Sequence, residues 1–297
     1  AFTATPGKLG EGVRSFYLRP HGVPFSDGLS ALFVERLFDL SATLLLAALG
    51  VLYFGRYLPL VLVPVAVVGV VLLLLNSPHN PTGAVLDDAE LAELAAVATH
   101  AGLLVLTDEV YEHLVFDGAR HRSIATLPGM RERTLVVSSA GKTFSVTGWK
   151  IGWVCGPAPL VSAVRTAKQF LTFVNGGPFQ PAVAVGLDLP DAFFAELAAD
   201  LQRRRDVLVE GLHAAGLPVV VPQATYFATV DVRPVRADGD GVAFCRELPH
   251  RAGVVGIPVG PFYDPADAHL GRHLVRFAFC KRDEVLAEAV ERLRRAG

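Results

Sequence analysis

Three groups of polar residues follow short apolar segments and could carry chemistry. They are Asn80, Asp108 and the pair Ser139 and Lys142. Together they offer an amide, a carboxylate, a hydroxyl and an amine, which are groups that bind polar ligands or transfer protons. In a parallel sheet, ligands bind at the carboxyl ends of the strands, where loops present such side chains. The positions of these residues therefore predict one ligand site at one edge of a sheet.

The elements that would position these residues alternate between strand and helix. Apolar strands are predicted at residues 103–106, 134–137 and 151–155, and helices at residues 87–100, 160–173, 181–187 and 191–215. Such alternation indicates an α/β fold with a mainly parallel sheet flanked by helices. The helix at 191–215 is amphipathic, and Arg203, Arg204 and Arg205 are expected on its solvated side.

The pattern divides the chain into three parts. Residues 70–190 are expected to form a large ligand-binding domain, and residues 191–297 a smaller C-terminal α/β domain. Strands of that smaller domain are predicted at 219–221, 226–232, 254–257 and 273–279, followed by a helix at 282–295. Residues 1–69 form an atypical N-terminal segment without clear periodicity.

Composition excludes several classes of function. The chain has 297 residues and a formal net charge of -2, so it carries no electrostatic footprint for nucleic acid. Its three cysteines, Cys155, Cys245 and Cys280, are far apart and form no CxxC pair. We therefore expect neither a disulfide framework nor a metal site, and a reducing cytoplasm is the expected location.

One segment is unusually apolar, and it has two interpretations. The mean hydropathy of the chain is +0.42, and between residues 40 and 75 only Arg56 is charged. The two apolar runs approach the length of a membrane span. Alternatively, Pro59, Pro64 and Gly69 divide the stretch into short valine-rich strands. We predict a buried strand for residues 70–75, whereas both interpretations stay open for residues 40–69.

Five motifs in this order resemble the fold-type-I pyridoxal-phosphate (PLP) enzymes, specifically the class I and II aminotransferases. The motifs are NSPHNPTG (76–83), TDEVY (107–111), SSAGK (138–142), TGWKIGW (147–153) and HLVRFAFC (273–280). The resemblance covers residues 70–297. Within the family, NSPHNPTG and CKRD (280–283) look most like the kynurenine/glutamine-type and succinyldiaminopimelate-type branch.

The resemblance implies a role for each residue that faces the cofactor ring. Lys142 would form the Schiff base with PLP and then move the proton between the substrate α-carbon and the cofactor. Asp108 would keep the pyridine nitrogen protonated, so that the ring acts as an electron sink. Tyr111 and Asn80 would bind the phenolic oxygen of the ring.

Three further residues would hold the charged ends of cofactor and substrate. Ser139 and Lys150 would bind the phosphate, although many relatives have arginine at the position of Lys150. Arg276 would bind the substrate α-carboxylate, a task that suits a planar two-donor group, and Asn80 lies on the substrate side as well. Tyr226 and residues 258–263 are candidate pocket walls, but core packing explains them equally well.

The implied reaction is transfer of an amino group from an L-amino acid to a 2-oxo acid, by a homodimer. A PLP β-lyase acting on cysteine conjugates is the alternative enzyme, because the same sink and lysine serve β-elimination. The resemblance also implies a phosphate-gripping turn, a stacking aromatic ring and a partner-subunit tyrosine before residue 70. Residues 1–69 show no convincing counterpart, and Gly10–Gly12 is only a weak candidate for the turn.

Three interpretations of this N-terminal segment stay open. The chain is an active enzyme with a compact or membrane-associated N-terminus, or a degenerate relative without activity. In the third interpretation, the first 75 residues do not represent the natural protein.

Overall fold

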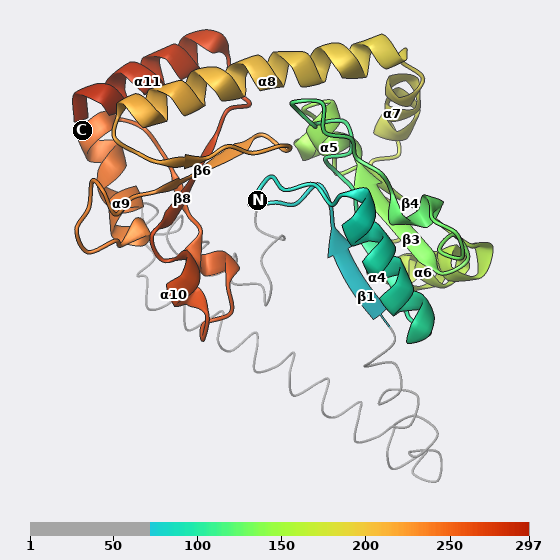
Figure 1. Cartoon of the computed structure of the whole chain (residues 1–297). Coiled ribbons are helices and arrows are strands. Elements are labelled where there is room, and N and C mark those ends of the chain that lie inside the picture. Colours follow the sequence, from blue (N-terminus) through green and yellow to red (C-terminus); the bar gives the residue numbers. More distant parts are fainter. Residues whose placement is uncertain (1–71, 297) are drawn as a thin grey trace, which may run out of the picture. The chain divides into compact units, whose positions relative to one another are not determined.

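The computed structural model describes residues 72–296, which begin with a four-stranded sheet of order β1-β2-β3-β4 (Figure 1). The strands are β1 (Leu72–Asn76), β2 (Leu104–Asp108), β3 (Thr134–Ser139) and β4 (Gly152–Cys155). The β1–β2 and β2–β3 pairs are parallel, whereas β4 runs antiparallel to β3. The prediction of a mainly parallel sheet is therefore confirmed.

Helices connect these strands close to the predicted places. They are α4 (Asp88–His100), α5 (Ala140–Thr143), α6 (Ala158–Leu171) and α7 (Phe179–Leu187), with short 3₁₀ turns η4 (Ile124–Thr126) and η5 (Thr147–Trp149). Helix α4 starts with a capping box, in which the Asp87 carboxylate accepts from the backbone N–H groups of Ala89 and Glu90. The Glu90 carboxylate in turn accepts from the Asp87 N–H at 2.9 Å, which stabilises the first turn.

Strand β1 forms as predicted, but the prediction that it is buried is wrong. Leu72 is exposed and Leu74 has 69% of its surface exposed, while Leu73 and Leu75 pack against the core below α4. The reason is that alternate side chains of a strand face opposite sides of the sheet, and α4 covers only the side that carries Leu73 and Leu75. Residues 40–69, for which a membrane span and short strands are the two interpretations, lie outside the described residues. Within residues 72–296, no helix is long and apolar enough to span a membrane.

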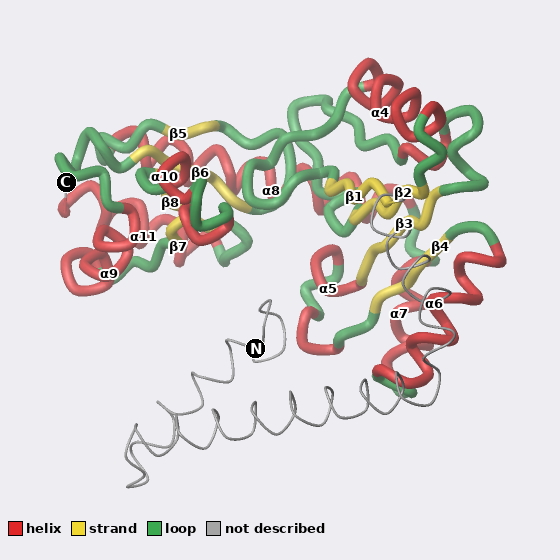
Figure 2. The backbone as a smooth tube through the Cα atoms, turned by 90° about the horizontal axis from the view of Figure 1, so that it is seen from below, coloured by secondary structure: helices red, strands yellow, loops and turns green. Residues whose placement is uncertain are grey.

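The second sheet has the order β5-β6-β8-β7 and is entirely antiparallel. Its strands are β5 (Val219–Val220), β6 (Phe227–Asp231), β7 (Ile257–Pro258) and β8 (Leu274–Ala278). Its helices are α8 (Asp191–Ala214), α9 (Gly241–Ala252), α10 (Ala268–Gly271) and α11 (Asp283–Ala296), with the 3₁₀ turn η6 (Gly260–Phe262). In Figure 2 the strands β6, β7 and β8 lie together with α9 and α11. The strand predicted at 254–257 is largely wrong, since only Ile257 of it is extended in the sheet.

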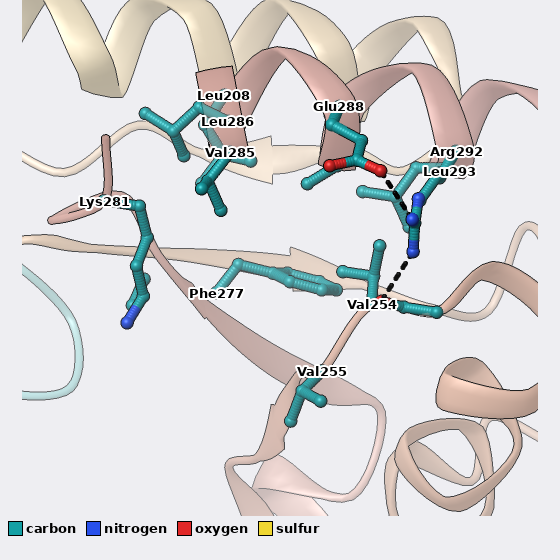
Figure 3. Close-up of a pocket in the computed structure, with 13 residues that line it drawn as sticks. Leu208, Val254, Val255, Phe277, Lys281, Val285, Leu286, Glu288, Arg292 and Leu293 are labelled. Carbon is teal, nitrogen blue, oxygen red and sulfur yellow. Dashed lines mark hydrogen bonds and ion pairs between the residues drawn. The ribbon is translucent and has the colours of Figure 1, made fainter. Parts of the chain in front are cut away.

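Helices α8 and α11 pack closely over the second sheet (Figure 1). A Cβ at Gly211 would lie 2.3 Å from Val290, so glycine permits this approach. Between α11 and β8 lies an apolar pocket of about 240 Å³ (Figure 3). Leu286 and Phe277 line it, and the Glu288–Arg292 pair stands at its edge. None of the predicted site residues line this pocket.

Arg205 corrects one prediction for α8. It was expected on the solvated side, but only 3% of its surface is exposed. Its guanidinium pairs with Asp117 and with Asp206, and it also donates to the Pro222 carbonyl at 3.1 Å. Arg205 is therefore a buried cation that two carboxylates neutralise.

Candidate active site

Lys142 lies on the short helix α5, directly after β3. Its Nζ atom is 5.9 Å from the ring centroid of Tyr111 and 5.8 Å from that of Tyr226. The following loop is tied back to this helix, because the Thr147 hydroxyl donates to the Gly141 carbonyl at 2.8 Å. This bond fixes the loop against α5, and the half-buried lysine side chain lies beside two aromatic rings.

Tyr111 follows β2 and is buried. Its ring meets Tyr226 edge to face, with centroids 5.4 Å apart, and its hydroxyl accepts from Asn80 Nδ2 at 3.4 Å. Burial raises the pKa of Tyr111 far above its usual value, and the neighbouring Tyr226 raises it further. The phenol therefore keeps its proton at neutral pH and is available as a donor.

Asn80 connects the first sheet to the second. Its side-chain oxygen accepts a hydrogen bond from Nη1 of Arg276, which lies in β8, while its nitrogen donates to Tyr111. Gly83 allows the turn that carries Asn80, because its φ is +72° and a Cβ there would lie 2.3 Å from Pro222. Asn80, Tyr111 and Arg276 are thus joined in one hydrogen-bonded chain that passes beside Lys142.

Arg276 is buried without a counter-charge. Only 7% of its surface is exposed, its Nε atom has no hydrogen-bond partner, and it forms no ion pair with any carboxylate of residues 72–296. Burial lowers the pKa of its guanidinium from the usual value. Because a buried charge is costly unless it is paired, this arginine is suited to an anionic ligand. Arg205 shows the opposite arrangement, with two carboxylates in place.

Three residues predicted to bind a phosphorylated ligand meet at one cavity. Ser139, Lys142 and Lys150 line the same pocket of about 940 Å³, whose apolar wall is formed by side chains of the sheet, including Val137 and Trp153. Lys150 is exposed and has a left-handed backbone with φ 58°. The pocket is therefore lined by three lysines, because Lys168 joins Lys142 and Lys150, and by hydroxyl side chains that include Ser139, next to an apolar surface.

Asp108 ends β2, in register with Asn76 of β1 and Val137 of β3. Its Oδ1 atom accepts from the Val110 backbone N–H at 3.1 Å, and no cation of residues 72–296 pairs with it. The carboxylate is half-buried at the end of the sheet, so its second oxygen can accept from a ligand.

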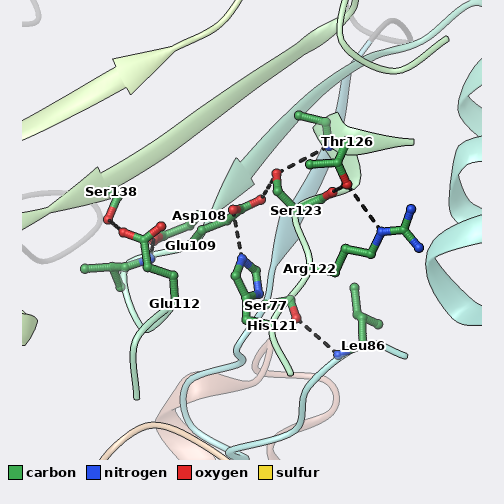
Figure 4. Close-up of polar contacts among 12 residues, drawn as sticks. Ser77, Leu86, Asp108, Glu109, Glu112, His121, Arg122, Ser123, Thr126 and Ser138 are labelled. Carbon is green, nitrogen blue, oxygen red and sulfur yellow. Dashed lines mark hydrogen bonds and ion pairs between the residues drawn. The ribbon is translucent and has the colours of Figure 1, made fainter. Parts of the chain in front are cut away.

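Buried polar residues beside the site were not found from the sequence (Figure 4). Glu109 accepts from the Ser123 hydroxyl at 2.7 Å and contacts Nε2 of His121 at 2.9 Å. The Ser138 hydroxyl donates to Glu112 at 2.8 Å. Strand alternation next to Asp108 could have indicated Glu109, because neighbouring side chains of a strand face opposite sides.

The candidate pocket walls do more than fill the core. Tyr226 lies beside Lys142 and Tyr111, and Phe262, within the 258–263 segment, lies against Arg276. Tyr263 has a different place, because its ring packs where a Cβ on Gly271 would lie.

Comparison with known families gives two matches along the chain. The profile of the family described as aminotransferase class I and II matches residues 64–293. The profile described as lysylphosphatidylglycerol synthase TM region matches residues 1–104. The two overlap from 64 to 104, where the described residues form β1, α4 and the start of β2.

Individual relatives agree with the first match. A probable N-succinyldiaminopimelate aminotransferase from Mycobacterium tuberculosis is 54% identical over 74% of this chain and 57% of its own length. A kynurenine–oxoglutarate transaminase from Dictyostelium discoideum is 41% identical over 75% of this chain and 55% of its own. The solved structure of the Mycobacterium tuberculosis N-succinyldiaminopimelate aminotransferase matches with a TM-score of 0.73, covering 76% of this chain and 58% of that one. The chain thus spans somewhat more than half the length of these relatives.

Proposed function

The chain belongs to the class I and II aminotransferases, and we propose that it transfers an amino group from an L-amino acid to a 2-oxo acid with PLP bound at Lys142. One observation carries this proposal. Asn80 links the unpaired cation of Arg276 to Tyr111, and the amine of Lys142 lies beside the Tyr111 ring. This arrangement supports a site that combines a carboxylate-binding group with a proton-accepting amine.

The side chains present fit PLP, the cofactor of this family. They provide an amine at Lys142, a free carboxylate oxygen at Asp108, and hydroxyl and cationic donors at Ser139 and Lys150. When bound, PLP supplies an electron sink for the electron pair left at the substrate α-carbon. The chemistry of the donor set matches the ring nitrogen, the aldehyde carbon and the phosphate of that molecule.

Each residue near the ring then has a defined task. Lys142 would hold the cofactor covalently through Nζ, and its amine, once released, would take the proton from the substrate α-carbon and return it. Asp108 would keep a proton on the ring nitrogen by accepting from it. Tyr111, whose phenol stays protonated, and Asn80 donate to the phenolic oxygen of the ring.

The remaining residues are assigned to the charged groups of the cofactor and the substrate. Ser139 and Lys150 would bind the phosphate as a hydroxyl donor and a point charge. Arg276 binds the α-carboxylate of the substrate, which supplies the missing counter-charge. Asn80 occupies one donor of that guanidinium and leaves the other donors to the substrate.

The experiment that tests this function is an amino-transfer assay on the full chain with added PLP. Because relatives are named for N-succinyldiaminopimelate and kynurenine, these two amino donors with 2-oxoglutarate are the first combinations. Glutamate is expected to form only when both donor and acceptor are present. If a cysteine conjugate instead yields pyruvate and ammonia without an acceptor, the β-lyase alternative is correct.

We also infer that the enzyme is a homodimer formed through α6. This helix buries none of its side chains in the described structure, and Phe170 has 83% of its surface exposed. The apolar surface continues through Leu171, Phe173 and Val174, and the last two line the pocket that contains Lys142. A second copy is the occupant we assign, because exposed apolar surface beside a ligand pocket suits a permanent interface.

The double substitution Phe170→Ser and Leu171→Ser tests this interface. In sedimentation experiments the natural chain is expected to be a dimer and the variant a monomer of unchanged helix content. A natural chain that sediments as a monomer at every concentration would rule the dimer out.

A membrane association of the N-terminal segment is a second candidate property. It is supported by the match of residues 1–104 to a TM-region profile and by the single charge, Arg56, between residues 40 and 75. The free cysteines of the described part are compatible with a catalytic unit on the cytoplasmic side. Detergent partitioning of the full chain should then exceed that of a chain starting at Val70, and equal partitioning would exclude the association.

A further inference from the structure

The guanidinium of Arg276 lies against two aromatic rings. Its Cζ atom is 3.8 Å from the ring centroid of Phe227 and 4.9 Å from that of Phe262. Phe227 belongs to β6 and Phe262 to η6, the turn that follows β7. Because β8 lies between β6 and β7 in the sheet, the two rings approach Arg276 from opposite sides of its own strand.

Sheet register places Phe227 and Arg276 on the same face. Arg276 pairs with Thr229 of β6, and Phe227 is two residues from Thr229 along that strand. Residues two apart in a strand face the same side, so Phe227 is a diagonal neighbour of the arginine. Phe262 is not a core residue, since 52% of its surface is exposed. A polar residue at this position of the turn would cost no core packing. The contact with Arg276 is therefore made by a ring that the core does not require.

Aromatic partners suit an arginine that must receive a ligand. The negative face of an aromatic ring attracts the cation and partly offsets the cost of its burial. Unlike a carboxylate, however, a ring face takes none of the in-plane N–H donors. Arg205 also lies near a ring, that of Phe116 at 5.2 Å, but there Asp117 and Asp206 use its Nη1, Nη2 and Nε donors, so none of these nitrogens is left for a ligand.

We propose that Phe227 and Phe262 are positioning residues that hold the plane of the Arg276 guanidinium, so that the donors not used by Asn80 point at a substrate carboxylate. The identity of the ligand rests on the proposed function, whereas the clamp itself concerns only this chain. Phe262 is the more informative of the two rings, because its exposure makes substitution tolerable to the fold.

Nuclear magnetic resonance of the full chain without cofactor tests the clamp directly. The side-chain N–H signals of Arg276, assigned through Arg276→Lys, are expected to be shifted by the ring currents and to show slow rotation of the guanidinium. Phe262→Leu keeps the apolar bulk and should lose both signatures, while Phe262→Tyr should retain them. Tyr263→Leu is the matched control, since it removes a neighbouring ring that packs at Gly271, and it should leave the Arg276 signals unchanged.

Titration with the dicarboxylate maleate gives a second readout. Loss of one cation–π contact is expected to weaken maleate binding by about 5- to 30-fold in Phe262→Leu and not in Phe262→Tyr. Unchanged Arg276 signals or unchanged affinity in Phe262→Leu would overturn the proposal. If the natural chain shows the clamp signatures but binds no maleate, the clamp stands and the carboxylate role in the proposed function fails.

Discussion

Substitution of Lys142 with alanine is expected to abolish amino transfer, lowering kcat by at least about 10³-fold. The reason is that this amine has two tasks, as the covalent anchor of the cofactor and as the group that takes the proton from the substrate α-carbon. Among residues 72–296, Lys150 and Lys168 line the same pocket, but only Lys142 has its amine beside the rings of Tyr111 and Tyr226, so neither is expected to replace it. The measurement is the steady-state formation of glutamate from 2-oxoglutarate by the purified variant.

Lys281→Ala is the matched control for this prediction. Lys281 lines the apolar pocket beside α11, outside the candidate site, so its loss is expected to change kcat less than about two-fold. Retention of more than a tenth of the natural activity by Lys142→Ala would contradict the assignment of the proton transfer to this lysine.

Arg276→Met is expected to lower kcat/KM by about 10²- to 10³-fold while leaving the fold intact or more stable. Two charge-assisted hydrogen bonds to a carboxylate contribute roughly 3–4 kcal/mol, which accounts for the loss of activity. In the absence of substrate, however, Arg276 is a buried cation without a carboxylate partner. Its replacement by an apolar side chain of similar length removes a desolvation cost, which offsets the loss of the hydrogen bond to Asn80, so Tm should be unchanged or a few degrees higher.

Arg205→Met provides the contrasting control, because this second buried arginine is paired with Asp117 and Asp206. Its loss leaves the Pro222 carbonyl without its donor, so we expect about 1–3 kcal/mol of destabilisation with little effect on the activity of the folded fraction. Thermal unfolding of both variants and their kcat/KM values separate the two roles. If Arg276→Met unfolds as early as Arg205→Met, Arg276 is structural and the carboxylate assignment is wrong.

The site residues that the sequence predicted best are those that directly follow an apolar strand or lie within one. Asp108 and Lys142 follow apolar segments that form β2 and β3, so their places at the end of a parallel sheet could be predicted. The position of Arg276 in a strand was also predicted, because its neighbours Val275 and Phe277 are apolar. These features need only short-range patterns, which a single sequence contains.

Features that depend on distant parts of the chain could not be predicted. The helical pattern predicts Arg205 to be solvated. It is buried because its guanidinium pairs with Asp117, which lies 88 residues earlier in the chain. Leu74 is exposed because α4 covers only the opposite side of β1, and a single strand does not show which side of its sheet will be covered. The contact of Phe262 with Arg276 likewise depends on the pairing of β7 with β8.

Covalent trapping at Lys142 is the most direct test of the central claim, that this side chain and its neighbours form one cofactor site. The full chain is incubated with PLP, reduced with borohydride, digested and analysed by mass spectrometry. The site described here predicts one phosphopyridoxyl group per chain, on Lys142, with Lys8, Lys150, Lys168 and Lys281 unmodified. Absence of the label, or a label spread over the other lysines at similar levels, would contradict it.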